Sequence, residues 1–277
     1  MKLPLRPIFP ASASRPVVSP LMPSVVYDVP TPDALDDLYE GRAEGYTYAR
    51  EKHPNAPHLA TLIDEMEGAT GGTVVSSGMS AISLSLLCTA SAGDHVIAGH
   101  QLYGRSNRLI SEELPRLGIA TSKVATTDAS NVAAAIRVDT RAILVETVSN
   151  PTLRVADLDS IIALGREKKI AVIVDNTFTT PIGYQPLKAG ASITVHSVTK
   201  LLAGHSDATL GYLAADTPER NARIRDLMAS WGSTPSPFDC WLAERGLYSF
   251  GLRHARPQAT AEHLAAALRA PANVAKV

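Results

Sequence analysis

AILVETVSNPTLRVADLDSIIALGREKKIAVIVDNTFTTP (residues 142–181) holds two short apolar runs with an amphipathic segment between them. The runs at 142–146 and 170–174 are almost wholly aliphatic, which is typical of strands buried on both faces. Between them, residues 158–168 place their apolar side chains at helical spacing. This order predicts two parallel strands joined by a crossover helix.

The same alternation extends along most of the chain. Further helices are predicted at residues 58–67, 79–90, 106–117 and 131–137, and further strands at 73–75, 95–98, 120–125, 192–196 and 210–214. Short apolar runs that alternate with longer helical patterns predict an α/β protein with a mostly parallel sheet.

Composition removes several classes of function. The 277 residues include 26 basic and 27 acidic side chains, a net charge of -1, so the basic surface that binds nucleic-acid backbones is not expected. No apolar run is long enough to span a membrane, and two cysteines cannot build a disulfide framework or a four-thiolate zinc site. The proline-interrupted start does not resemble a secretory signal. We therefore expect a cytoplasmic enzyme.

The two ends of the chain differ from its middle. Eight of the 19 prolines fall at or before position 32, which favours an extended N-terminal arm over residues 1–45 that lies on another surface, such as a second subunit. A disordered tail is the alternative. Residues 46–237 form the predicted main domain. Helices predicted at 238–250 and 259–268 make residues 238–277 the start of an incomplete C-terminal domain.

Ligands of open α/β sheets bind beyond the carboxyl ends of the strands, so the residues that follow each strand are candidates for a binding site. After the strand at 73–75 comes SSGM (76–79), where Gly78 allows close approach of a ligand and the helix that follows offers free N–H groups to an anion. An ordinary serine cap with a tight turn is the simpler reading of this segment alone.

Three other strand ends carry polar groups. Asn150 precedes a proline, which extends its backbone and can aim its amide at a ligand. Asp175 ends a buried strand and needs a cationic or N–H partner. Lys200 is flanked by hydroxyl and apolar residues, as a functional amine or a side chain that snorkels to solvent would be. Each has an ordinary structural explanation: a turn, a loop cap or a surface lysine.

Together these features supply an anion cradle, hydroxyl groups, an amide donor, a carboxylate for a ring N–H and a lysine for a Schiff base. Pyridoxal 5′-phosphate (PLP) requires that set of groups. GxGxxG after a strand, GxxxxGK[ST], GxSxG, HExxH and paired CxxC are absent, so nucleotide, hydrolase-elbow and metal sites lack their motifs.

The order of the motifs resembles the trans-sulfuration, or Cys/Met metabolism, family of PLP-dependent enzymes, which includes cystathionine γ-synthases and γ-lyases. The matching stretches are GYTYAREKHPN (45–55), SSGMSAI (76–82), LYGRSNR (102–108), ETVSNP (146–151), VDNTFTTP (174–181), HSVTKLLAGHSD (196–207) and RGLYSFGLR (245–253). The resemblance implies the large domain of the aspartate aminotransferase-like fold type I, with its C-terminal domain truncated.

The resemblance also implies roles for individual residues. Lys200 would form the Schiff base with PLP and act as the base, Asp175 would hold the ring nitrogen protonated, and Tyr103 would stack on the ring. Asn150 would contact the ring hydroxyl oxygen. The remaining cofactor contacts implied, mostly to the phosphate, are Gly78, Met79, Thr177, Ser197 and Thr199.

Other implied roles reach beyond this pocket. Tyr48 and Arg50 match a pair that contacts the phosphate in the neighbouring subunit, which implies a homodimer or homotetramer with shared active sites. Arg108 matches a distal-carboxylate contact of cystathionine-handling members. Arg105 replaces the family's usual glycine and would put a charge beside the ring.

The implied activity is elimination or replacement on a small amino-acid substrate, a sulfur amino acid or an O-acylhomoserine. In the family, the arginine that binds the substrate α-carboxylate lies in a C-terminal segment with no counterpart in these 277 residues. A truncated PLP-binding remnant with little or no turnover is therefore the alternative hypothesis.

Overall fold

A seven-stranded sheet forms the centre of the protein, whose computed structural model describes residues 17–269 and 274. The strand order is β1-β7-β6-β5-β4-β2-β3, and β7 alone runs opposite to the others. The predicted mostly parallel sheet is therefore confirmed. The strands are β1 (Thr73–Val75), β2 (His95–Gly99), β3 (Ala120–Val124), β4 (Thr140–Glu146), β5 (Ala171–Asp175), β6 (Ile193–Ser197) and β7 (Gly211–Ala215).

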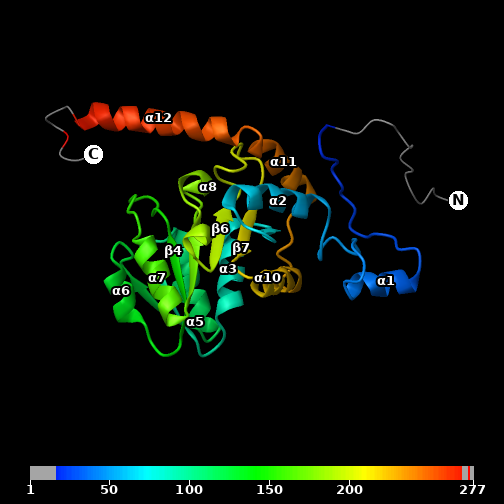
Figure 1. Cartoon of the computed structure of the whole chain (residues 1–277), viewed down its shortest axis with the longest axis horizontal. Helices are drawn as coiled ribbons and strands as arrows, with labels where there is room; N and C mark the ends of the chain where they lie inside the picture. The colour runs from blue at the N-terminus through cyan, green and yellow to red at the C-terminus, as the bar shows by residue number, and fades with distance from the viewer. Residues whose placement is uncertain (1–16, 270–273, 275–277) are drawn as a thin grey trace.

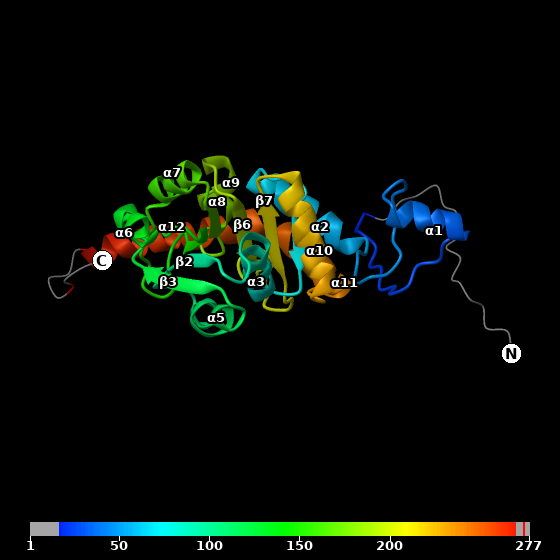
Figure 2. The same cartoon turned by 90° about the horizontal axis from the view of Figure 1, so that it is seen from below.

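Helices cover both faces of the sheet (Figure 2). The core of one face is shared by α3 (Gly78–Thr89), α10 (Pro218–Ser230) and a continuous helical run made of α4 (Gly104–Arg108), a π-helical turn (Leu109–Glu113) and α5 (Leu114–Arg116). The opposite face is covered by α6 (Ala129–Ala135) and α7 (Leu158–Lys168). At the β1–β7 edge lie α2 (Asn55–Glu67) and α11 (Pro237–Leu247), and the short helices α8 (Thr180–Gly183) and α9 (Pro186–Ala189) follow β5.

Two helices differ from the prediction. The sequence analysis did not predict α10, whose composition is strongly polar and whose buried apolar side chains are only Ile224, Leu227 and Met228. The helix α12 (Phe250–Arg269) is longer than predicted, because a helix was expected only over residues 259–268 of this segment. It continues through Pro257, although a proline lacks the N–H that would bond to the carbonyl four residues earlier and usually ends a helix.

The N-terminal arm contains a helix that was not expected. Helix α1 (Pro32–Tyr39) begins at the last of the clustered prolines, and its N-cap, Thr31, accepts a hydrogen bond from Ala34 N at 3.2 Å. Proline suits the first turn of a helix because its missing N–H has no partner there anyway. The expectation of a fully extended arm over 1–45 is therefore wrong at α1, and residues 1–16 of that segment lie outside the described residues.

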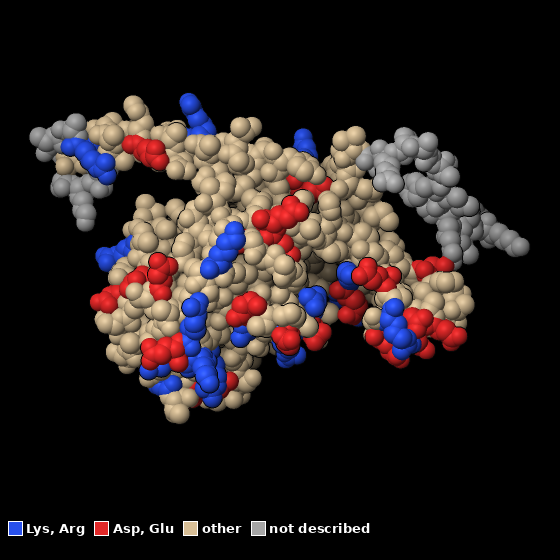
Figure 3. All heavy atoms as spheres, in the orientation of Figure 1, with Lys and Arg blue, Asp and Glu red and all other residues tan. Residues whose placement is uncertain are grey.

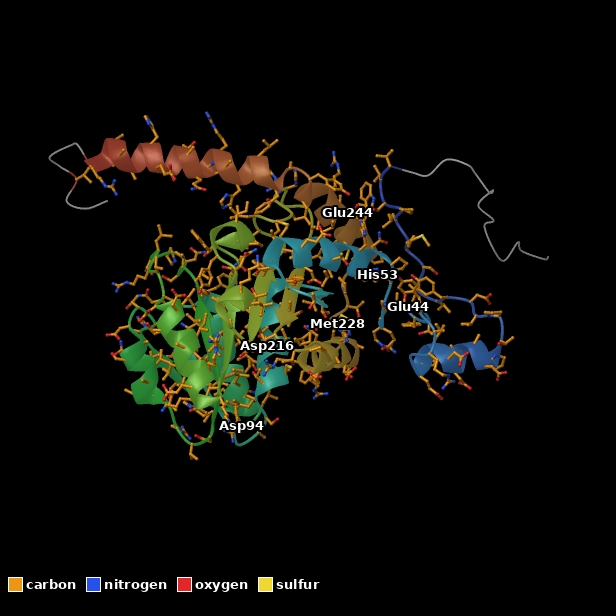
Figure 4. All side chains as sticks on the ribbon, in the orientation of Figure 1. Glu44, His53, Asp94, Asp216, Met228 and Glu244 are labelled. Atoms are coloured by element: carbon orange, nitrogen blue, oxygen red, sulfur yellow. The ribbon has the colours of Figure 1, made fainter. Side chains whose placement is uncertain are left out.

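The arm is tied to the body of the same chain before α1 projects away from it (Figure 1). Ser19 Oγ donates to Glu244 on α11, and Trp241 Nε1 donates to the Ser19 carbonyl at 2.9 Å. Asn55, at the start of α2, accepts from Met22 N at 3.0 Å. Figure 4 shows Glu244 on α11, next to the segment that leads into α2. The surface on which residues 19–22 lie is thus formed by α2 and α11.

The C-terminal helices are attached unequally. Cys240 and Ala243 of α11 are buried in the core at the β1–β7 edge, whereas Phe250 is the only buried residue of α12. In Figure 3, α12 projects from the body with a hollow beneath it. The assignment of residues 238–277 to a second domain stays a prediction.

Charges of both signs are interspersed on the face shown in Figure 3. Among the helices of the described residues, none combines the length and the apolarity that a bilayer crossing requires.

Candidate active site

The carboxyl ends of β4, β5 and β6 open into a cavity of about 1360 Å³. Helix α3 borders it on one side, and the first turns of α12 on another. The structure brings together nine of the predicted site residues in its lining, namely Gly78, Met79, Tyr103, Asn150, Asp175, Thr177, Ser197, Thr199 and Lys200. Strand ends that were far apart in sequence therefore meet at one edge of the sheet, as the topology of parallel strands requires.

The N-terminus of α3 forms one wall of the cavity. Its N-cap, Ser77, has an extended backbone and accepts from Ser80 N at 3.1 Å, so the N–H groups of Gly78 and Met79 remain as the first free donors of the helix. A Cβ atom on Gly78 would lie 2.6 Å from Ser197 Cβ. Only glycine therefore allows α3 and the end of β6 to approach this closely, and the result is a cradle suited to an anion.

The cradle is also pressed against β7. A Cβ atom on Gly211, the first residue of β7, would lie 2.1 Å from the Ser77 carbonyl oxygen and 3.0 Å from Gly78 N. These are backbone atoms, which cannot rotate away as a side chain can.

We expect Gly211→Ala to destabilise the folded protein by about 3 kcal/mol, the upper range for overpacking, because the sheet and α3 must separate. Urea unfolding followed by circular dichroism measures this change. Gly251→Ala in α12 is the matched control: its Cβ meets no atom within 4 Å and its φ is not in the left-handed region. Equal midpoints for the two variants would contradict the expectation.

Asp175 lies at the end of β5 within the cavity wall. Its Oδ1 accepts from Thr177 N at 3.1 Å, and Thr177 Oγ1 accepts from Ser197 N at 2.7 Å. Burial raises the pKa of Asp175, while its hydrogen bonds with Thr177 and the charge of His196 act in the opposite direction. A carboxylate in this environment is stabilised by a cationic N–H partner that enters the cavity.

Lys200 lies in the turn that follows β6, and its side chain is exposed to the cavity. Lys200 N donates to the Ser197 carbonyl at 3.1 Å, and Thr199 Oγ1 accepts from Leu210 N at 2.9 Å. Val198 and Leu202 on either side are buried. The backbone around the lysine is therefore fixed, while its amine remains accessible.

Arg253 of α12 holds the segment after Lys200. Its guanidinium donates to the carbonyls of Leu201 at 2.7 Å, Leu202 at 2.9 Å and Gly246 at 2.8 Å. Arg253 also lines the cavity, although its place at the end of the motif RGLYSFGLR does not by itself indicate this. Its function in the structure is to fasten α12 to the lysine-bearing turn.

Glu146 is a cavity residue that the sequence analysis did not assign. Its Oε1 accepts from Tyr103 N at 2.6 Å, which fixes the backbone of the loop that carries the Tyr103 ring. The pKa of Glu146 is raised to about 7: burial and the nearby Asp175 raise it, and hydrogen bonds from the Tyr103 and Asn150 backbones lower it. The signal was available, because Glu146 ends a buried strand as Asp175 does.

Three predicted residues and Arg105 do not line this cavity. Arg108 pairs with Glu112 at 2.7 Å on the surface, so its predicted contact with substrate stays a prediction that this arrangement does not support. The Arg50 guanidinium lies over the Tyr48 ring, 4.9 Å from its centroid. Arg105, expected beside the ring, is an exposed residue of α4.

Comparison with known proteins gives consistent results. The family described as "Cys/Met metabolism PLP-dependent enzyme" matches residues 10–277. Cystathionine gamma-lyase of Bacillus subtilis is 38% identical over 213 residues, which cover 77% of this chain and 56% of that protein. Cystathionine beta-lyase of Lactococcus lactis subsp. cremoris is 37% identical over 237 residues, covering 86% and 62% respectively. The chain thus spans less than two thirds of the length of these relatives.

Two solved structures resemble the chain closely. A protein of Campylobacter jejuni named as an O-acetylhomoserine (thiol)-lyase superposes with a TM-score of 0.89 at 26% identity, covering 94% of this chain and 72% of that one. That structure contains N′-pyridoxyl-lysine-5′-monophosphate. The metB protein of Corynebacterium glutamicum superposes with a TM-score of 0.85 at 32% identity, covering 93% and 65%.

Proposed function

This chain belongs to the Cys/Met metabolism family of PLP-dependent enzymes, and from this premise we propose that its cavity binds PLP and that the whole protein eliminates or replaces a β- or γ-substituent of a sulfur amino acid or an O-acylhomoserine. The observation that carries the proposal is the meeting of Lys200, Asp175 and the α3 cradle in one cavity. Relatives named as cystathionine lyases and a synthase support this substrate class.

The residues present fit the cofactor. The free N–H groups of Gly78 and Met79 with the hydroxyls of Ser197 and Thr199 would hold the phosphate, and the half-buried Asp175 would bind the protonated ring nitrogen. The absence of a Cβ at Gly78 lets Ser197 approach the N-terminus of α3, which brings its hydroxyl close to the free N–H groups of the helix. When bound, PLP supplies an electron sink for the bond broken at the substrate α-carbon.

The remaining roles follow from position in the cavity. Lys200 Nζ would bind PLP covalently and, once released by the substrate amine, would take the proton from the substrate α-carbon. Tyr103 would lie on the ring, and Asn150 would donate its amide to the ring hydroxyl oxygen. Thr177 would keep Asp175 oriented, since it bonds to Asp175 and to the end of β6.

An oligomer with shared sites is part of the proposal. Tyr48 and Arg50 lie outside the cavity of their own chain, as a pair that serves a neighbouring site would. Arg50 is also suited to phosphate because its planar fork satisfies two oxygens at once. A cytoplasmic location is consistent with Cys88 and Cys240, which are both free thiols.

The proposal is tested by titrating the purified protein with PLP and then assaying cystathionine and O-acetylhomoserine for release of 2-oxo acid, ammonia or thioether product. We expect saturable visible absorbance and turnover of at least one of these substrates. Saturable binding without turnover would instead identify a PLP-binding remnant. No absorbance change on titration would contradict the cofactor assignment itself.

A further inference from the structure

Glu146 and Asp175 form a pair of neighbouring carboxyl groups. Their Cα atoms are register partners on the adjacent parallel strands β4 and β5. Two residues earlier, Leu144 and Ile173 belong to the same core cluster, and side chains two residues apart project from the same face of a sheet. Both carboxyl groups therefore leave the sheet on the α3 face, and both line the cavity.

Each carboxyl group has different partners. Glu146 accepts hydrogen bonds from the backbones of Tyr103 and Asn150, which carry two of the predicted ring contacts. Burial raises the pKa of Asp175, while its hydrogen bonds with Thr177 and the neighbouring His196 act in the opposite direction. Two carboxylates this close in a buried site do not both ionise readily. Asp175 is the one that a cationic ring nitrogen would neutralise, so the proton of the pair belongs on Glu146.

A second, small hollow lies behind Glu146. Its volume is about 20 Å³, enough for one water molecule, and its lining includes Glu146, Ser149, Thr126, His100 and Arg154. His100 is exposed, and its Nδ1 lies 2.9 Å from the Val124 carbonyl oxygen. Glu146 therefore lines both the active-site cavity and this hollow, whose lining also includes the exposed His100.

We propose that Glu146 is a positioning residue that holds a proton at pH 6, and that in this neutral form it fixes the Tyr103 and Asn150 loops while Asp175 carries the negative charge of the pair when PLP is bound. The proposal rests on the PLP function proposed above. Asp175, Lys200 and Tyr103 face Glu146 around the cavity, and His100 and Arg154 face it across the small hollow.

Infrared spectroscopy of protein labelled with ¹³C-glutamate tests the proton directly. We expect a protonated-carboxyl band in wild type at pH 6 that is lost as the pH rises through about 7, the pKa of Glu146, and that is absent from Glu146→Gln over the same pH range. Glu113→Gln is the matched control, because the Glu113 side chain is 45% exposed and pairs with Arg116 at the surface. A band that persists in Glu146→Gln, or no band in wild type, would overturn the proposal.

Stability provides a second readout with a definite sign. The pKa of Glu146 rises from 4.5 to about 7 on folding, so wild type loses stability as the pH rises through this window and is level above it. Glu146→Gln lacks this pH-dependent contribution to the free energy of unfolding. If the Glu146 carboxyl group did not titrate in this range, the substitution would change the free energy of unfolding by the same amount at every pH. A pH-independent difference between the two proteins would contradict the proposal.

PLP titration separates this inference from the proposed function. Glu146→Gln keeps one acceptor and one donor and should bind PLP at pH 6 within about twofold of wild type, whereas Glu146→Ala, which releases both loops, should bind about tenfold more weakly. Because the carboxyl band is measured without cofactor, failure of wild type to bind PLP together with a Glu146 band at pH 6 would reject the proposed function and leave the proton on Glu146. Normal PLP binding with equal affinities for Glu146→Ala and wild type would reject the positioning role alone.

Discussion

Lys200→Ala is expected to abolish covalent attachment of PLP completely. No other lysine lines the cavity within the described residues, so borohydride reduction of the loaded variant should leave no pyridoxyl adduct detectable by mass spectrometry. Turnover should fall to the background rate, since the same amine is the proposed base. The fold should survive, because the Lys200 side chain is exposed and its backbone bond to Ser197 is retained.

Lys168→Ala provides the control for this experiment. Lys168 ends α7 and pairs with the neighbouring Glu167, both of them on the surface. That variant should keep the full wild-type yield of trapped adduct. An adduct that persists in Lys200→Ala at wild-type yield would show that another amine attaches the cofactor.

Asp175→Asn is expected to weaken PLP binding by about a hundredfold. Removing one member of a buried ion pair costs about 3 kcal/mol, and the asparagine can no longer neutralise the protonated ring nitrogen. Equilibrium dialysis or fluorescence quenching measures the dissociation constant. Thr177→Val removes the hydroxyl that bonds to Asp175 but leaves the charge of Asp175 in place, so it should weaken PLP binding less.

Asp175→Asn should not destabilise the cofactor-free protein at pH 7. Burial raises the pKa of Asp175, so the folded state tolerates the ionised carboxylate poorly and loses stability as the pH rises above the ordinary carboxyl range. A neutral asparagine removes that penalty. Weaker PLP binding combined with equal or higher urea stability would mark Asp175 as a residue kept for function at a cost in stability. A large loss of stability in the cofactor-free variant would instead assign it a structural role.

The arrangement of the sheet and much of the cofactor site are predictable from sequence for a common physical reason. Buried parallel strands leave aliphatic runs of distinctive length, and their carboxyl ends must lie at one edge of the sheet. Asp175 and Lys200 follow such runs, and the structure places both in the same cavity. The resemblance to a known family added their specific roles, which strand-end position alone left open.

Other features depend on contacts that sequence patterns do not encode. Arg253 binds the carbonyl of Leu201, 52 residues earlier, and no local pattern indicates such a pairing. Helix α10 escaped prediction because its buried stripe is narrow, although Thr217 and Pro218 form a recognisable helix start. Glu146 was not predicted for a different reason. Like Asp175 it ends a buried strand, but it is also the first residue of the motif ETVSNP, in which only Asn150 was given a role.

The attachment of Arg253 has a consequence for how the protein opens locally. The amides and carbonyls around residues 201–204 cannot leave the folded state while the guanidinium holds them, and α12 cannot unwind its first turn without releasing that guanidinium. The two segments therefore form one cooperative unit, in which a single opening event exposes both to hydrogen exchange and to proteases. The free energy needed to open the lysine-bearing turn is therefore the same as that needed to open the first turn of α12, although the rest of that helix lies almost entirely on the surface.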